Sequence, residues 1–122
     1  MISHAPALEG SVEVWNGASG ALYPYTVVEI GRQPNTAFGN YIFSKLNRAG
    51  WWVAIYVGHG DLSHLADLDQ HRMRDFIRQQ GATHVHIHEN SSMTSRMIER
   101  MDILEAHPEA AANSRYQGTI PA

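Results

Sequence analysis

The chain has 122 residues, of which 43% are hydrophobic and 17% are charged, and its formal net charge is −3 with eight histidines counted as neutral. This composition excludes a disordered chain, and the length fits a single domain that occupies residues 1–122. Because the chain is slightly acidic, any nucleic-acid partner would have to meet a local basic patch and not a basic protein.

The sequence contains no cysteine, which excludes disulfides, cysteine-based zinc sites and cysteine nucleophiles. It has no run of about 18 consecutive apolar residues, and the opening MISHAPALEG lacks the basic start and apolar run of a secretion signal. We therefore expect a cytoplasmic protein, a monomer or a homodimer, that does not associate with a membrane.

The first half of the chain predicts β-strands. Residues 12–15 (VEVW) alternate apolar and polar, which indicates a short edge strand, and residues 25–30 (YTVVEI) follow the strand-breaking Pro24. Residues 40–46 (NYIFSKL) and 51–57 (WWVAIYV) have the same β-branched and aromatic character. The connection between them, NRAG, contains a glycine that suits a turn, so these two runs predict a β-hairpin.

The second half predicts helix, strand and helix. Asp61 is a suitable cap for a helix that extends to about residue 80, either continuous or broken near Asp69, and Gly81 is a typical stop. Residues 83–88 (THVHIH) return to strand periodicity. A last helix is expected from Ser91 or Ser92 to just before Pro108.

Four apolar residues of the last predicted helix recur at i, i+4, i+8 and i+11: Met93, Met97, Met101 and Leu104. A methionine stripe at this spacing is typical of core packing, so we expect it to face the sheet. The order of elements predicts the α+β class, with a small, mainly antiparallel sheet built on the β-hairpin and flanked by helices.

The hairpin carries two tripeptides. Gly39-Asn40-Tyr41 opens its first strand, and Tyr56-Val57-Gly58 closes its second. The pair resembles the tripeptides for which the GIY-YIG endonucleases are named, and the chain is similar to small stand-alone bacterial members of that family from about residue 23 to about residue 113. Residues 1–22 would then be an N-terminal extension and residues 114–122 a tail.

The resemblance implies hydrolysis of DNA phosphodiester bonds with a single Mg²⁺ or Mn²⁺ ion. It also implies two tyrosines at the attacking water, an arginine from the first helix on the phosphate and a glutamate from the last helix on the metal. Tyr41 and Tyr56 match the two tyrosines. Residues 61–70, where the arginine is expected, contain none, and His64 is the only potentially cationic side chain there, which makes it the candidate substitute.

The position of the glutamate depends on the helix register. If Ile103-Leu104 is the apolar pair that follows the family's glutamate, the matching position is Arg100 and not Glu99. Relative to the methionine stripe, Glu99 points about 200° away, toward solvent, whereas Arg100 lies at about 60°, on the margin. Glu99 remains the candidate metal ligand; otherwise it is one more solvated charge.

Several arginines come from the two predicted helices. We name Arg72, Arg74, Arg96 and Arg100 as candidate DNA contacts, and Arg78 belongs to the same set of helix cations. Together they would supply the basic patch that the net charge does not. The alternative is that they are ordinary solvent-exposed charges on two helices.

The segment HVHIHENSS, residues 84–92, places histidines at alternate positions. His84, His86 and His88 are expected to share one side of a strand, facing outward or toward the nuclease cleft, while the apolar residues between them face the core. Neighbouring positions on one side are nearly ~7 Å apart, so a pair can chelate a metal but three rarely converge on one ion.

Three functional hypotheses are consistent with these observations. The first is a divergent GIY-YIG nuclease that acts on DNA, and the second is a catalytically inactive module of the same fold that binds nucleic acid or a protein partner. Trp51 and Trp52 adjoin in one predicted strand, so they should face opposite sides, and one of them is available to such a partner. The third is a histidine metalloprotein unrelated to nucleases.

Overall fold

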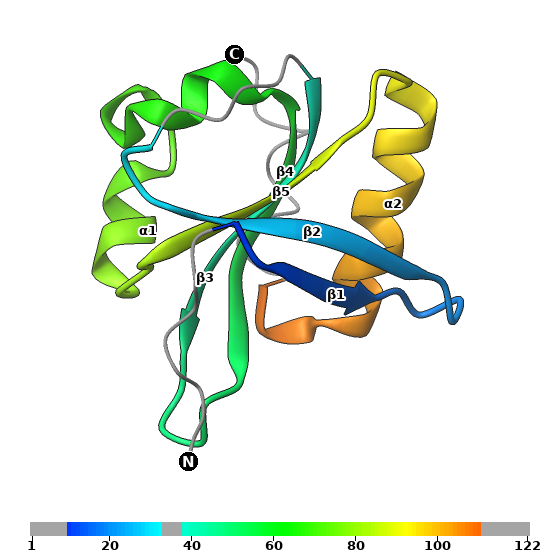
Figure 1. Cartoon of the computed structure of the whole chain (residues 1–122), viewed down its shortest axis with the longest axis horizontal. Helices are drawn as coiled ribbons and strands as arrows, with labels where there is room; N and C mark the ends of the chain where they lie inside the picture. Colours follow the sequence, from blue (N-terminus) through cyan, green and yellow to red (C-terminus); the bar gives the residue numbers. More distant parts are fainter. Residues whose placement is uncertain (1–9, 33–37, 111–122) are drawn as a thin grey trace.

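One five-stranded antiparallel β-sheet forms the centre of the molecule, with helical elements on both faces (Figure 1). The computed structural model describes residues 10–32 and 38–110. The expected α+β class, with a mainly antiparallel sheet built on a hairpin and flanked by helices, is confirmed. In the order in which they lie across the sheet, the strands are β1 (Val12–Asn16), β2 (Leu22–Glu29), β5 (His84–Glu89), β3 (Phe38–Leu46) and β4 (Trp52–Asp61).

The helical elements divide between the two faces of the sheet. One face is covered by two short 3-10 turns, η1 (Leu62–Ala66) and η2 (Leu68–Gln70), and by the helix α1 (Arg74–Gln79), whereas the other is covered by α2 (Met93–Ala106). None of the helices in the described part of the chain is long and apolar enough to cross a bilayer. The sheet therefore has two cores, which we call the α1 face and the α2 face.

The predicted β-hairpin is confirmed as β3 and β4. The Asn47 side chain holds the connection, because its Oδ1 accepts hydrogen bonds from the backbone N–H groups of Ala49 (2.9 Å) and Trp51 (3.0 Å). β4 begins only at Trp52 and continues to Asp61. Trp51 thus lies in the connection with 71% of its surface exposed, and not in the strand as expected.

The predicted strand at 12–15 is confirmed as β1, so part of the expected N-terminal extension belongs to the sheet. Its partner β2 starts at Leu22 and runs through Pro24, which does not break the strand as expected. β5 pairs with β2 only from Thr26 to Glu29, so the strand next to Pro24 on that side ends before it would need the missing N–H. The expected tail, 114–122, lies outside the described residues.

The histidine-rich strand β5 is inserted between β2 and β3, at the middle of the sheet. Val85 and Ile87 face the α1 core, as expected. His86 and His88 lie under α2, which covers the other face of this central strand; His86 is completely buried, and the His88 side chain is 29% exposed. The alternation of apolar residues and histidines thus reflects a strand with two covered faces.

The segment predicted as a helix from Asp61 to residue 80 is mostly not α-helical. Asp61 accepts a hydrogen bond from the Ser63 N–H (3.0 Å), and Asp67 accepts one from the Asp69 N–H (3.0 Å), so each aspartate starts a new short turn. The expected break near Asp69 is therefore close to the observed one. Gly81, in the left-handed region at φ 80°, follows the end of α1 as expected.

The orientation predicted for α2 is wrong, although its bounds and its Ser92 cap are confirmed. Met93, Met97 and Met101 are 62%, 49% and 63% exposed. The buried face instead carries Arg96, Glu99, Ile103 and Leu104. The reason lies in the sheet beneath, because it presents polar side chains that need partners, and α2 turns a carboxylate and a guanidinium toward them.

Candidate functional site

The fold brings the two motif tyrosines together. Tyr41 in β3 lies opposite Gly58 of β4, and Tyr56 lies opposite Phe43, so both rings point to the α1 face. The two rings are stacked with centroids 6.2 Å apart and planes 21° apart. Both side chains are buried in the core.

His71, just before α1, completes this group, and sequence reasoning did not identify it. Its Nε2 lies 2.8 Å from the Tyr41 Oη, and its Nδ1 accepts a hydrogen bond from the Met73 N–H (3.0 Å). Burial lowers the pKa of His71 to about 4, so the ring is neutral at pH 7. A neutral ring whose Nδ1 accepts carries its proton on Nε2, so His71 donates to Tyr41 and cannot take the tyrosine's proton.

Tyr56 is also not prepared to act as a base. Burial raises the pKa of Tyr56 to about 12, although the positive charges of Arg100 and Arg72 lower it. The phenol is therefore neutral at physiological pH. His64, the candidate substitute for the missing arginine, is exposed on η1 with its Nε2 3.8 Å from Asp61, and none of its contacts in the described residues joins it to either tyrosine.

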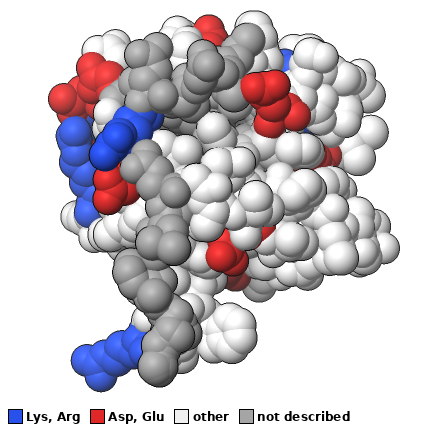
Figure 2. Space-filling view, viewed as in Figure 1, with Lys and Arg blue, Asp and Glu red and all other residues white. Residues whose placement is uncertain are grey.

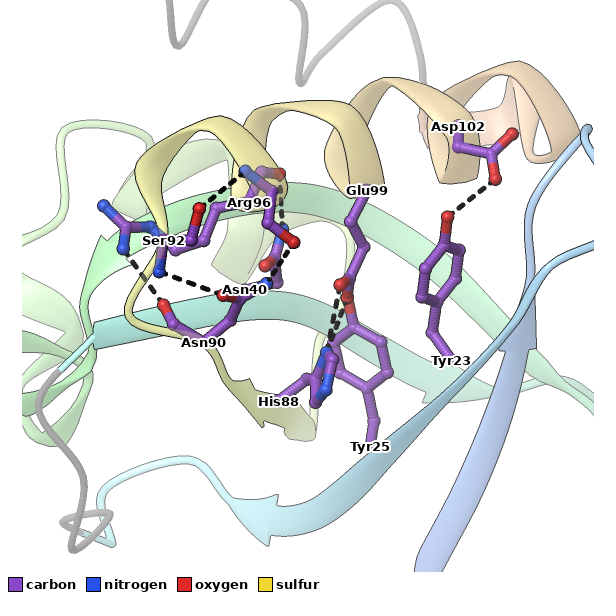
Figure 3. Close-up of polar contacts among 10 residues, drawn as sticks. Tyr23, Tyr25, Asn40, His88, Asn90, Ser92, Arg96, Glu99 and Asp102 are labelled. Carbon is purple, nitrogen blue, oxygen red and sulfur yellow. Dashed lines mark hydrogen bonds and ion pairs between the residues drawn. The ribbon is translucent and has the colours of Figure 1, made fainter.

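Glu99, the candidate metal ligand, lies on the opposite face of the sheet from the tyrosines. It is only 3% exposed, so the expectation that it points to solvent is wrong. Figure 3 shows its carboxylate held between β2 and β5: the Tyr25 hydroxyl donates to Oε2 (2.5 Å), and the His88 Nδ1 lies 3.0 Å from Oε1 and 2.8 Å from Oε2.

The carboxylate of Glu99 raises the pKa values of the groups around it. The hydrogen bond to Glu99 raises the pKa of His88 in spite of partial burial, which favours the cationic imidazole that a buried carboxylate needs. Burial and the carboxylate together raise the pKa of Tyr25 well above its ordinary value, so this phenol remains a donor. Tyr25, His88 and Glu99 thus form a closed network, which we call the Glu99 network.

The donor set around Glu99 does not fit Mg²⁺ or Mn²⁺. These cations need several oxygen ligands, whereas both oxygens of Glu99 already accept hydrogen bonds within the protein. Within residues 10–32 and 38–110 there is no group of three His, Asp or Glu side chains that could hold a metal ion. Nor do His84, His86 and His88 form one: His84 and His86 both stand edge-on to Trp52, and His88 is paired with Glu99.

Arg96 is buried and ties α2 to the strands. Its Nε donates to the His59 Nδ1 (3.3 Å), and its Nη1 donates to the Asn90 carbonyl (3.0 Å). Its backbone carbonyl accepts a hydrogen bond from the buried Asn40 side chain (2.9 Å; Figure 3). A guanidinium in this position adds positive charge but does not itself reach solvent.

Arg100 lies at the outer edge of the sheet. Its Nε donates to the Val57 carbonyl (3.2 Å) in β4, the edge strand. Its positive charge lowers the pKa of Tyr56 on the α1 face and the pKa of His59 on the α2 face. The side chain therefore lies where the two faces meet. Burial lowers the pKa of Arg100, but an arginine remains charged at pH 7.

Arg72 is exposed on the α1 side, and its positive charge lowers the pKa of Tyr56 and of His71. We call Arg72, Arg96, Arg100 and His59 the β4-edge cluster. Burial and the charges of Arg96 and Arg100 all lower the pKa of His59, which keeps it neutral. Sequence reasoning predicted the three arginines but not His59, whose only signal was its position after the second tripeptide.

The other two helix arginines are used near α1. Arg74 donates to the His71 carbonyl through Nη1 (3.3 Å), and Arg78 forms an ion pair with Asp69 (2.5 Å). On the face drawn in Figure 2, basic side chains lie beside acidic ones at the α1 edge, a basic side chain lies at the hairpin tip without an acidic neighbour, and the surface over α2 is mostly uncharged. This face therefore carries no broad basic patch.

Comparison of the chain with protein-family models, with curated proteins and with solved structures finds no match in any of the three.

Proposed function

We propose that the chain is a nucleic-acid-binding module with a GIY-YIG-like hairpin that does not hydrolyse DNA, and that the β4-edge cluster contacts phosphates. The observation that carries this proposal is that Arg100 bonds to the edge strand β4 from the α2 side, while the exposed Arg72 follows His71, whose ring contacts Tyr56 of the same strand from the α1 side. Two guanidiniums placed in this way can contact successive phosphates of one strand.

The buried member of the cluster has a supporting role. Arg96 holds His59 and the Asn90 carbonyl, so direct contact falls to the exposed Arg72 and the half-buried Arg100. The charge of Arg96 still strengthens the local field, which the net charge of −3 does not provide. Arg74 keeps only a peripheral part in this proposal.

The arrangement of the family's acid and base positions argues against catalysis. Glu99 is enclosed in its network, Tyr41 receives a hydrogen bond from a neutral histidine, and Tyr56 is a neutral buried phenol. A hydrolase needs an activated nucleophile and a group that stabilises the developing charge. Of these requirements, the chain offers only the cationic groups.

Fluorescence anisotropy with labelled single-stranded and duplex DNA, over a series of salt concentrations, tests the binding. We expect binding that weakens with salt, and Arg72→Ala and Arg100→Ala should each reduce the salt slope by about one. Arg48→Ala at the hairpin tip removes the same charge far from the cluster and is the matched control. Equal losses for all three variants would show that the cluster is not the interface.

The nuclease remains the second candidate because Tyr41 and Tyr56 do lie side by side with Arg100 acting on both. The same DNA incubated with Mg²⁺, Mn²⁺ or EDTA separates the two functions. We expect no cleavage under any condition. Metal-dependent cleavage that disappears in Tyr56→Phe and Glu99→Ala would establish the nuclease instead and would mean that the Glu99 network opens in solution.

A further inference from the structure

A hollow lies on the α2 face, between β1 and the start of β4. It has a volume of about 320 Å³ and is lined by Glu13, Val14, Trp15, Asn16, Trp51, Trp52 and His107. The β4-edge cluster surrounds residues 56–59, near the other end of β4. This part of the strand lies about 20 Å from the hollow, measured along β4. The hollow is therefore separate from the proposed phosphate site, and a ligand bound in it would not depend on phosphate binding at the β4 edge.

All three tryptophans of the chain line this hollow. The sequence led us to expect that Trp51 and Trp52 face opposite sides, but Trp51 precedes the strand, and both border the same space. Trp15 is buried, Trp52 is half-buried, and Trp51 is 71% exposed, so the indoles are graded from floor to rim. Three large aromatic faces therefore border one space, with the outermost open to solvent.

The indole rings are held in place by the buried His86. The Trp15 Nε1 donates to the His86 Nδ1 (2.9 Å), and the Trp52 ring stands edge-on to His86 with centroids 4.5 Å apart and planes at 85°. The Trp15 ring also stands edge-on to His107, with ring centroids 5.2 Å apart, and the His107 Nε2 donates to the Asn16 carbonyl (3.1 Å). Two of the three indoles are thus fixed before any ligand arrives.

The charge of the lining is acidic. Glu13 is its carboxylate, Glu109 lies 3.6 Å from His107, and among the residues that the structure describes no lysine or arginine belongs to the lining. An indole face attracts cations through its quadrupole, and a nearby carboxylate adds to that attraction. The same carboxylate opposes a phosphate or any other anion, so a nucleotide is the wrong ligand for this hollow.

We propose that this hollow binds a methylated ammonium group, with Trp15, Trp51 and Trp52 around the methyl groups and Glu13 on the charge. A trimethylated nitrogen is weakly hydrated, has no N–H that needs an acceptor, and presents an apolar surface that carries a positive charge. The volume suits a small ligand or one long side chain. A free quaternary amine and a trimethylated lysine of another protein share this chemistry.

Intrinsic tryptophan fluorescence of the full chain tests the proposal without background, because every tryptophan borders the hollow. Choline is titrated beside its neutral tert-butyl analogue, in which carbon replaces the nitrogen. We expect saturable quenching by choline with an affinity about tenfold above that of the analogue. Equal affinity for the two, or no saturation, would overturn the proposal.

Variants locate the binding. Trp51→Ala should weaken choline binding about fivefold or more, and Glu13→Gln about threefold, whereas Glu105→Gln on the exposed side of α2 removes a matched carboxylate and should change nothing. Because Trp51 is exposed, its loss does not endanger folding. Unchanged affinity in Trp51→Ala would overturn the proposal.

A third arm of the experiment identifies the source of the ligand. A peptide with one trimethyllysine is titrated beside the same peptide with unmodified lysine. Tighter binding of the trimethylated peptide than of choline supports a protein side chain as the ligand, and weaker binding supports a small amine. Equal binding of the two peptides would contradict a site that selects methylated nitrogen.

Discussion

A carboxylate buried under a helix is stable only if its oxygens are satisfied, and Glu99 shows how this chain achieves that. Glu99 extends from α2 toward the sheet. Tyr25 and His88, from two neighbouring strands, form hydrogen bonds with its carboxylate. A buried charge paired in this way is costly to disturb from either side. The Glu99 network is therefore a structural joint between α2 and the sheet.

The hydroxyl of Tyr25 is the simplest part of the joint to remove. Tyr25→Phe leaves the ring in place but deprives the buried Glu99 Oε2 of its donor, so we expect a loss of about 1.5–3 kcal/mol in the free energy of unfolding. Urea denaturation monitored by circular dichroism measures this loss.

Tyr23→Phe is the matched control on the same strand. The Tyr23 hydroxyl donates to Asp102 (2.8 Å), but that carboxylate also accepts hydrogen bonds from the Ser19 hydroxyl and backbone N–H. We expect a loss below about 1 kcal/mol. If the two variants lose equal stability, the Glu99 network contributes nothing beyond an ordinary surface hydrogen bond.

At the scale of secondary-structure elements, local patterns predict the strands well. The hairpin, β1 and β5 follow from alternation and turn residues, because those signals act between near neighbours in sequence. The face that α2 buries depends instead on Tyr25 and His88, which come from distant parts of the chain. The periodicity of the helix contains no information about those distant partners. The methionine stripe therefore predicts the wrong buried face.

The same limit applies to the candidate site. The tyrosines of the two tripeptides were predictable because the hairpin places them in register. His71 lies 30 residues from Tyr41, and Arg96 lies 37 residues from His59. Their contacts arise when distant elements pack against the hairpin. No local sequence pattern predicts this packing.

The reversed orientation of α2 makes a direct prediction. Met101→Gln replaces an exposed methionine and should change the free energy of unfolding by less than about 0.5 kcal/mol. Ile103→Ala, two residues later, empties a fully buried position and should cost about 2–5 kcal/mol. Chemical denaturation of both variants decides between the two orientations, and a larger loss for Met101→Gln would restore the stripe to the core.

The glycine that opens the first tripeptide has a packing role. A Cβ on Gly39 would lie 2.2 Å from the His88 carbonyl oxygen and 2.8 Å from a Leu62 methyl group. The glycine therefore permits β5 and η1 to approach β3, whatever the site does.

Gly39→Ala should consequently cost more than about 2 kcal/mol, because the nearest obstacle is backbone and cannot rotate away. Gly60→Ala is the control: it meets nothing within 4 Å but carries a strained φ of 145°, so a loss of about 1–3 kcal/mol is expected from backbone strain alone. Thermal unfolding compares the two. A cooperative, fully stable Gly39→Ala protein would contradict this packing role.

For the molecule as a whole, buried neutral histidines on both faces of the sheet link stability to pH. Burial lowers the pKa of His71 to about 4 on the α1 face and that of His86 to about 3 on the α2 face. In the unfolded chain both would titrate near ~6.5. His88 acts in the opposite sense: its raised pKa gives a contribution that is complete below ~6.5 and is lost as pH rises through the folded value.

Among the described residues three histidines, His59, His71 and His86, have a lowered pKa and one, His88, has a raised pKa, so the fold should lose stability on acidification. Below about pH 6.5 the unfolded chain binds protons at His71 and His86 that the folded chain does not, and for the fully buried His86 this costs about 1.4 kcal/mol per pH unit. Urea denaturation at about pH 7, 5.5 and 4.5 measures the decline in the free energy of unfolding.

His86→Phe identifies the source of that decline. The variant should be less stable at pH 7, because the buried Trp15 Nε1 loses its acceptor, but its stability should fall less steeply with acid by about 1.4 kcal/mol per pH unit. His64→Gln removes an exposed histidine and should leave the slope of the parent protein. If His86→Phe also keeps the parental slope, His86 is protonated as easily in the folded chain as in the unfolded one, and burial between the two tryptophans does not hold it neutral.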